Sequence, residues 1–212
     1  MARGLPWRDA LASRSLWLQN LMQFLANVAW VFLITWMPTY LIDEFHLGLE
    51  EAGRLASLPL FGSMAGSLLG GWLTDRLTRI LGLRWGRALP GIAARVLSAA
   101  GFVAAALARD PYLATGALVF AAFISDLGLA GTWAYFQDTG GPFVGTFLAW
   151  ANMFGNFGAA VGPNFVIELA RYPRLGWPGA LAACAGIMLL AGLCWLGIDA
   201  RVPIVRSSGD KA

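Results

Sequence analysis

The stretch GGWLTDRLTRILGLRWGR, residues 70–87, places one aspartate and four arginines between two long apolar runs. The chain otherwise carries little charge, since 13% of its 212 residues are charged and 58% are hydrophobic. The mean hydropathy is +0.63, and this composition is typical of an integral membrane protein. Residues 70–87 are therefore predicted to form a loop outside the bilayer between two membrane-spanning helices.

Six apolar runs are long enough to cross a bilayer, which takes roughly 17 to 25 helical residues for about 30 Å of hydrocarbon. They lie approximately at 15–42, 52–73, 88–107, 112–136, 142–169 and 178–198. The sequence thus predicts an all-α membrane protein in which residues 15–198 form a six-helix transmembrane bundle. Residues 1–14 are predicted to be a linker and residues 199–212 a tail.

The basic residues predict the orientation of the bundle. They lie in short clusters rather than along one stripe, so nucleic acid is not an expected partner. One face collects ten of them and the other only four, namely Arg54, Arg109, Arg171 and Arg174. Because cytoplasmic loops are enriched in Lys and Arg, linker, tail and both termini are predicted to be cytoplasmic. The expected location is the cell inner (plasma) membrane.

Small residues spaced four apart predict close helix packing, because they let two backbones approach within a bilayer. The second run carries Gly62, Gly66 and Gly70. The fifth run pairs Gly145 with Ala149, Gly155 with Ala159 and Gly158 with Gly162. These faces are interpreted as packing surfaces, and a surface on which helices slide during function is the alternative.

Two runs carry amide side chains at the depth of the membrane, where polar groups are costly. Helical spacing puts four polar or aromatic residues on one face of the first run: Asn20, Gln23, Asn27 and Trp30. The fifth run adds Asn152 and Asn156. Amides both donate and accept hydrogen bonds, so they suit a hydroxylated or carboxylated ligand. Hydrogen bonds between helices are the alternative role.

Arg95 and Asp126 are the charges farthest inside the apolar runs. Each lies about eight residues from the cytoplasmic end of its run, and a short turn joins the two runs. Equal depth on neighbouring helices predicts an intramembrane ion pair. The alternative is that Asp126 titrates as a proton carrier beside Arg95.

The sequence lacks the constellations that enzymes use. Its single histidine, His46, lies in an outer loop, and no intramembrane serine has a histidine partner. No metal-ligand spacing occurs, and residues 70–76 lack the lysine of a phosphate-binding loop. We therefore expect no enzymatic activity, no cofactor and no metal.

Three segments resemble the major facilitator superfamily of transporters, and its anion:cation symporter family in particular. Gly71, Asp75 and Arg76 follow the G-x-x-x-D-R pattern of the superfamily's cytoplasmic loop, with Arg79 as a further basic residue. NVAWVFLITWMPTYL, residues 27–41, resembles the seventh helix of the anion:cation symporters. GTWAYFQDTGGPFVGTFLAWANMFGNFGAAVGP, residues 131–163, resembles their tenth and eleventh helices.

The resemblance implies that the six runs correspond to helices seven to twelve, the C-terminal half of a twelve-helix transporter with its substrate site near the midplane. Bacterial members of that family carry sugar acids such as hexuronates and aldonates together with protons. The matching substrate contacts are Thr132, Trp133 and Asn152, with Gln23 and Asn27 as weaker matches. Gly71, Asp75, Arg76 and Arg79 would form the cytoplasmic gating loop, with Asp75 exposed and lacking its partner in the other half.

The leading hypothesis is therefore a half-transporter that moves small organic anions with protons by alternating access. The resemblance implies a truncated gene product or one member of a split pair, so an N-terminal six-helix half or a second copy would be needed for transport. The alternatives are a non-transporting membrane partner of another protein and a non-functional fragment.

Overall fold

The described part of the chain, residues 7–205 of a computed structural model, is almost entirely helical. Residues 1–6 of the predicted linker and 206–212 of the predicted tail lie outside the described residues. The elements in order are α1 (Trp7–Ala12), α2 (Arg14–Thr35), α3 (Met37–Phe45), α4 (Leu49–Leu107), α5 (Pro111–Leu127), α6 (Leu129–Thr139), the short 3-10 turn η1 (Gly141–Phe143), α7 (Val144–Arg171) and α8 (Gly176–Leu196).

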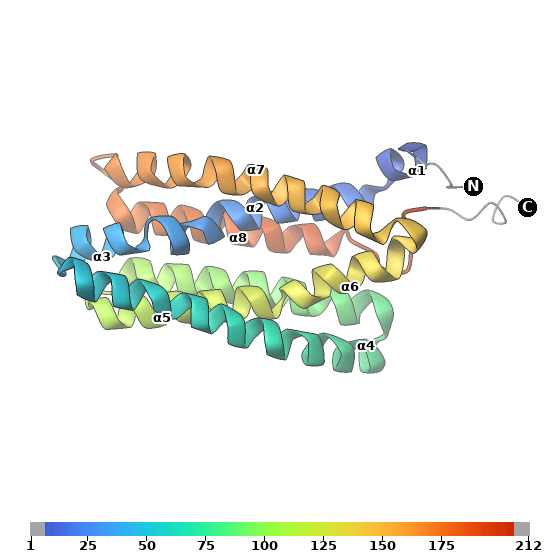
Figure 1. Ribbon diagram of the computed structural model, residues 1–212, viewed down its shortest axis with the longest axis horizontal. Helices are drawn as coiled ribbons and strands as arrows, with labels where there is room; N and C mark the ends of the chain where they lie inside the picture. Colours follow the sequence, from blue (N-terminus) through green and yellow to red (C-terminus); the bar gives the residue numbers. More distant parts are fainter. Residues whose placement is uncertain (1–6, 206–212) are drawn as a thin grey trace, which may run out of the picture.

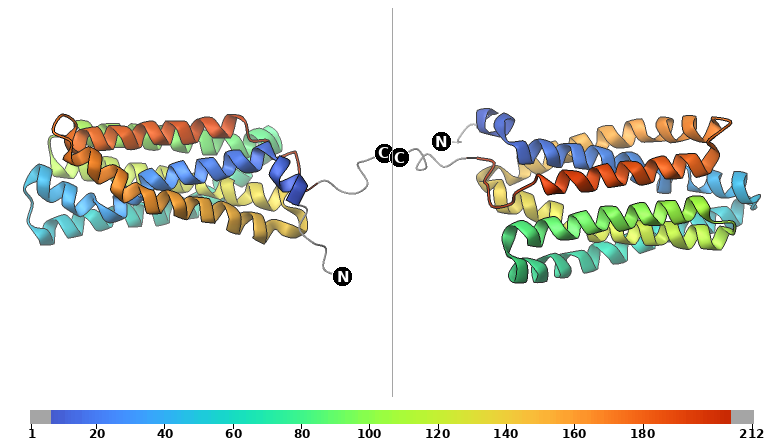
Figure 2. Two further views of the ribbon diagram at one scale, coloured as in Figure 1. Left: turned by 90° about the horizontal axis from the view of Figure 1, so that it is seen from above. Right: turned by 180° about the vertical axis from the view of Figure 1, so that it is seen from behind.

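The long helices run along one axis and form a bundle (Figure 1). One end, called the α1 end, holds α1, the bend of α4, the connection from α6 to α7 and the end of α8. The other end, called the α3 end, holds the connections from α3 to α4, from α4 to α5 and from α7 to α8, as the two further views show (Figure 2). The first and last described residues thus both lie at the α1 end, as expected for an even number of crossings.

Four stretches of helix are long and apolar enough to cross a membrane: Arg14–Thr35, Leu49–Leu107, Pro111–Thr139 and Gly176–Leu196. α4 has 59 residues and reverses its direction once, so it has the length for two crossings. α7 has 28 residues but a more polar composition, which includes Asn152, Asn156 and Asn164. The count of six crossings therefore stays a prediction.

The predicted loop at 70–87 is wrong in its local structure, because this stretch is helical on both sides of a single break. Gly82 lies inside α4 with φ 75° and ψ 173°, a conformation open to glycine and strained for other residues. The chain reverses there, and the two arms come so close at Gly86 that an added Cβ would collide with the backbone of Thr78. The charges of this stretch thus sit on two helix ends.

Two predicted single helices are also interrupted. The first run divides between α2 and α3 at Trp36, just before Pro38, whose missing N–H cannot continue the helical hydrogen bonds. The Trp36 indole donates to the Pro163 carbonyl of α7 at 2.9 Å, which ties the break to a second proline-containing helix. The fourth run divides between α5 and α6 at Gly128, close to mid-length.

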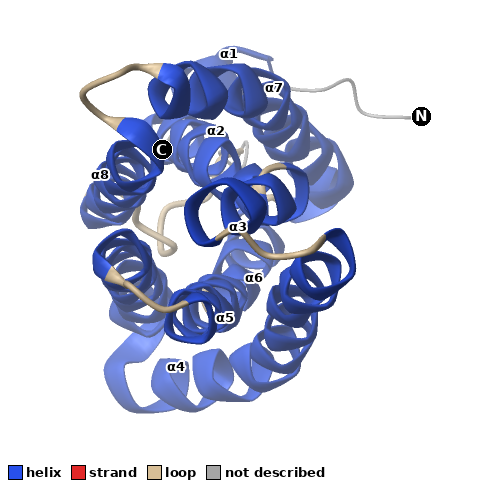
Figure 3. Cartoon of the chain, turned by 90° about the vertical axis from the view of Figure 1, so that its left-hand side faces the viewer, coloured by secondary structure: helices blue, strands red, loops and turns tan. Residues whose placement is uncertain are grey.

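The glycine faces pack as predicted. A Cβ at Gly66 or Gly70 would collide with the α5 backbone at Phe123 or Leu127. A Cβ at Gly158 would collide with the backbone of Phe24, so α7 lies directly on α2. Gly145 has open space instead, so its predicted packing role is not seen. Viewed from the α3 end, the helices surround a narrow interior (Figure 3).

The close contact at Gly66 predicts that alanine substitution of two glycines in α4 has different effects on stability. Gly66→Ala should lower the free energy of unfolding in detergent by about 1–3 kcal/mol, because the methyl group forces α4 and α5 apart. Gly71→Ala, five residues along, meets no atom within 4 Å. It should be neutral or stabilising by up to about 1 kcal/mol, since alanine favours helix. Equal losses from both changes, measured by denaturant titration, would contradict this packing.

Candidate functional site

Side chains from five helices line a cavity of about 190 Å³ at mid-length of the bundle, called the central cavity. α2 contributes Gln23, Ala26, Asn27 and Trp30, α4 contributes Arg95, α5 contributes Ser125 and Asp126, α6 contributes Leu129 and Trp133, and α7 contributes Asn152. The structure therefore brings together most of the polar residues singled out from the sequence, which lie on separate runs of the chain.

The close contact of α2 with α7 positions the amides. A Cβ at Gly155 would lie 2.9 Å from Nδ2 of Asn27, so the missing side chain makes room for that amide. The same Nδ2 donates to the Gln23 carbonyl at 2.9 Å, which fixes its orientation along α2. The glycine spacing of α7 thus serves both packing and the placement of a polar group in the cavity.

Two of the predicted substrate contacts lie outside the central cavity. Thr132 is buried, and its hydroxyl has no hydrogen-bond partner within residues 7–205. Asn156 is exposed, and its Nδ2 donates to the Asn152 carbonyl at 2.9 Å. Thr132 and Trp133 are adjacent, so they point in different directions from α6, and only Trp133 lines the cavity. Asn156 shares a face of α7 with Asn152 but lies one turn farther along the helix.

The predicted direct ion pair between Arg95 and Asp126 is not formed. Both residues line the central cavity and interact electrostatically, but no N···O distance between them is within the 4 Å of an ion pair. Arg95 instead donates from Nη1 to the Ser125 hydroxyl at 2.6 Å. Arg95 and Asp126 line the same cavity, in agreement with their predicted equal depth. The hydrogen bond from Arg95 to Ser125 was not predicted.

A second hollow, called the inner groove, extends from the central cavity toward the α1 end and has a volume of about 410 Å³. The two share three lining residues: Asp126, Leu129 and Trp133. The far part of the inner groove is lined by Thr74, Asp75 and Arg87. Asp126 is thus the acidic group that borders both hollows within the described chain.

An arginine with two carboxylate partners joins the helices at the α1 end. Arg87 donates from Nε to Asp138 at 2.9 Å and from Nη1 to Asp75 at 3.3 Å. The Arg87 side chain is 11% exposed, whereas that of Asp75 is 68% exposed. Asp75 is therefore exposed as predicted, and Arg87 of the same chain is its partner.

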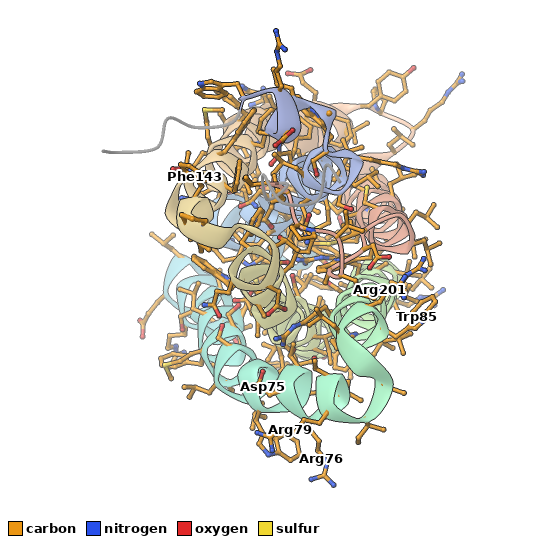
Figure 4. The ribbon with its side chains drawn as sticks, turned by 90° about the vertical axis from the view of Figure 1, so that its right-hand side faces the viewer. Asp75, Arg76, Arg79, Trp85, Phe143 and Arg201 are labelled. Carbon is orange, nitrogen blue, oxygen red and sulfur yellow. The ribbon has the colours of Figure 1, made fainter. Side chains whose placement is uncertain are left out.

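The remaining residues of the predicted gating loop lie on the outer surface of α4 (Figure 4). Arg76 stacks over the Trp72 ring at 5.7 Å, and Arg79 shares a shallow hollow with Asp75 and Arg76. Gly71 borders the inner groove. These residues form a basic surface at the α1 end, on a helix rather than in a loop.

The segment after α8 closes the α1 end. Ile204 donates its backbone N–H to the Thr139 carbonyl at the end of α6. Asp199 accepts from Arg201 at 2.7 Å, and this hydrogen bond holds the pKa of Asp199 at about 2. The carboxylate also faces Arg84 at 3.9 Å, so the segment is bound to both α6 and α4.

Sequence reasoning missed two functional contacts. Ser125 has no distinguishing feature in the sequence except that it precedes Asp126. Asp138 lies beyond the predicted end of the fourth run, and no residue pattern indicated its pairing with Arg87. Arg87 itself was counted only as a marker of orientation.

A family model described as Major Facilitator Superfamily matches residues 2–163. The chain belongs to the major facilitator superfamily. The predicted resemblance is thereby confirmed, and with the apolar helices it indicates a multi-pass membrane protein of a superfamily of transporters.

The relatives of this superfamily member include several anion transporters. The "Probable galactarate/D-glucarate transporter GarP" of Escherichia coli (strain K12) is 31% identical over 175 residues, which cover 82% of this chain. The "Ascorbate transporter, chloroplastic" of Arabidopsis thaliana is 24% identical and covers 90% of this chain. The chain spans 38% and 35% of the length of these two relatives.

Solved structures agree on the fold. The proton:xylose symporter XylE bound to 6-bromo-6-deoxy-D-glucose superposes with a TM-score of 0.63 at 16% identity, over 87% of this chain and 45% of XylE. A bacterial homologue of the lysosomal transporter Spinster superposes with a TM-score of 0.62 at 15% identity, over 92% of this chain and 50% of that protein. The bundle therefore matches about half of a transporter of this superfamily.

The unequal exposure of the two Arg87 partners predicts unequal effects on stability. Asp138→Asn removes the less exposed carboxylate and should lower the free energy of unfolding by about 1–2 kcal/mol, because Arg87 is nearly buried. Asp75→Asn should cost less than about 1 kcal/mol, since a solvated ion pair contributes little. Denaturant titration of both variants in the same detergent tests this, and a larger loss for Asp75→Asn would contradict the assignment.

Proposed function

We propose that this chain forms one six-helix half of a secondary transporter that moves small organic anions together with protons. The two arms of α4, the pairs α2 with α3 and α5 with α6, and the helices α7 and α8 would be its six crossings. The observation that carries this proposal is the central cavity, in which one guanidinium and three amides face a space at mid-length of an apolar bundle.

The substrate class follows from the chemistry of that lining together with the relatives. A guanidinium favours a carboxylate, and amides hydrogen-bond to hydroxyl groups as donors and acceptors. GarP is named for galactarate and D-glucarate, which carry both groups. Gln23, Asn27, Trp133 and Asn152 are the proposed substrate contacts on this half, with Thr132 and Asn156 becoming contacts if α6 and α7 turn during transport.

A complete pathway requires a second bundle against this one. The central cavity and inner groove are only partly enclosed by this bundle, and the part of the relatives that this chain does not match would supply the covering helices. Substrate sites between two such bundles become accessible from each side in turn when the bundles rock against each other. An N-terminal half or a second copy of this chain would take that place.

The basic residues support a cytoplasmic location for the α1 end. Arg76, Arg79 and Arg201 lie at this end (Figure 4), and Arg84 faces Asp199 there. Such an excess of arginine is expected for the cytoplasmic face of a protein in the inner membrane. The surface of Gly71, Asp75, Arg76 and Arg79 would contact the second bundle when the carrier faces outward. Release of that contact would open the inner groove to the cytoplasm.

Transport can be measured in proteoliposomes that contain this chain together with the part of GarP that it does not match, supplied as a separate polypeptide. We expect uptake of labelled D-glucarate that requires both polypeptides, rises with an inward proton gradient and stops when a protonophore is added. Liposomes with the GarP part alone are the control.

The other outcomes are informative. Uptake by this chain alone would identify a second copy as the covering half. Absence of uptake of D-glucarate, a hexuronate and ascorbate under every proton gradient would contradict the transport function. It would favour a role as a membrane-bound partner of another protein.

A further inference from the structure

Arg95 is a buried cation that forms no direct ion pair with any carboxylate of residues 7–205. The residue is 3% exposed, and its Nη1 donates to the neutral Ser125 hydroxyl. Its Nε has no hydrogen-bond partner within residues 7–205. A buried guanidinium that lacks an ion pair is costly, so a group that supplies both a negative charge and acceptor atoms binds strongly there.

Asp126 is the counter-charge in the same cavity, and the rest of the lining is neutral. Arg95 and Ser63 reach Asp126 from the two arms of α4. The faces of α2, α6 and α7 present Gln23, Asn27, Trp133 and Asn152, which do not titrate. Asp75 and Arg87 line the far part of the inner groove, where they pair with each other. The charge of the central cavity is therefore set by two residues.

We propose that Arg95 binds a carboxylate of the transported anion, and that Asp126 takes up one proton when it does. The inference rests on the proposed transport function and assigns the anion-binding cation and the proton site of this half. No covalent bond changes: one carboxylate and one proton enter the cavity together, and both leave together.

Charge balance is the physical reason for this linkage. With Asp126 ionised and no ligand, the cation and the carboxylate cancel. A second carboxylate would leave a net negative charge in a region of low dielectric, where like charges repel strongly. Protonation of Asp126 removes that repulsion, so Arg95 and one ligand carboxylate become the neutral pair. The pair that includes Arg95 is neutral in both states, and the two states differ by one carboxylate at Arg95 and one proton on Asp126.

The same argument explains why Arg95 and Asp126 stay apart. A direct ion pair would occupy the guanidinium donors and compete with the substrate. Arg95 instead donates from Nη1 to Ser125, and its Nε has no acceptor within residues 7–205. Ser125 is thus a positioning residue, and Arg95 is the binding residue.

Calorimetry on the purified chain in lipid nanodiscs tests the proposal without a second half. D-glucarate, D-galacturonate and ascorbate are titrated at one pH in two buffers of different ionisation enthalpy, which gives the number of protons bound per anion. We expect uptake of about one proton for the anion that binds. Affinity should fall by about tenfold per pH unit at pH values where Asp126 is ionised in the free protein. D-Glucitol, a polyol without a carboxylate, should bind without proton uptake or not at all.

Two variants separate the roles. Arg95→Gln should weaken anion binding by about thirtyfold or more, because a buried charged partner is lost. Asp126→Asn mimics the protonated state, so it should bind the anion without proton uptake and with an affinity that does not change with pH. Arg109→Gln and Glu50→Gln, at exposed positions of the α3 end, are the matched controls. Thermal unfolding followed by tryptophan fluorescence identifies any variant that is not folded.

Anion binding without proton uptake by the unaltered chain would overturn the proposal, and so would unchanged binding by folded Arg95→Gln. Failure of all three anions to bind would overturn it as well. In each case, proton-driven uptake by the assembled carrier would leave the proposed function standing. Proton-linked binding at Arg95 without uptake would instead contradict the transport function and leave this site in place.

Discussion

A cation can lie inside an apolar helix bundle only where other polar groups surround it, and Arg95 imposes this constraint on the structure. Its guanidinium is buried at mid-length of the bundle. The cost of that burial is reduced by the Ser125 hydroxyl and by the charge of Asp126 nearby. The amides of α2 and α7 extend this polar lining on the opposite side of the central cavity. Arg95 thus lies where side chains of several helices offer polar groups to one cavity.

Glycine contacts bring these polar groups together. Gly66 and Gly70 let one arm of α4 lie on α5, while Gly155 and Gly158 let α7 lie on α2. Helices in a bilayer gain little from burying apolar surface against each other, so backbone approach at small residues largely determines which helices are neighbours. The central cavity lies between these two tightly packed pairs. The breaks at Trp36 and Gly128 interrupt the helices that line it, and such interruptions are common where transporters bind substrate.

Much of this arrangement could be predicted from the sequence. The length of the apolar runs predicted where the helices lie. Glycine spacing and amide spacing are local periodic patterns, and they predicted which helix faces pack together and which line the cavity. The depth of Arg95 and Asp126 was predicted by counting residues from the cytoplasmic ends of their runs. The contacts that were not predicted depend on the geometry of side chains from different helices. Arg95 donates to the hydroxyl of Ser125, and Asp138 of α6 accepts from Arg87 of α4. The chain reverses at Gly82, the one residue of α4 with a non-helical conformation. The residues on both sides are therefore helical, where a longer loop was expected.

The central claim is that a guanidinium in this half of the carrier holds the anion. An experimental structure of the chain in nanodiscs, determined with D-glucarate at low pH, tests it most directly. The account predicts density for a carboxylate within hydrogen-bond distance of Arg95, with the hydroxyl groups of the ligand beside the amides of Asn27 and Asn152. An anion bound instead on the exposed arginines of α4, with the central cavity free of ligand, would contradict it.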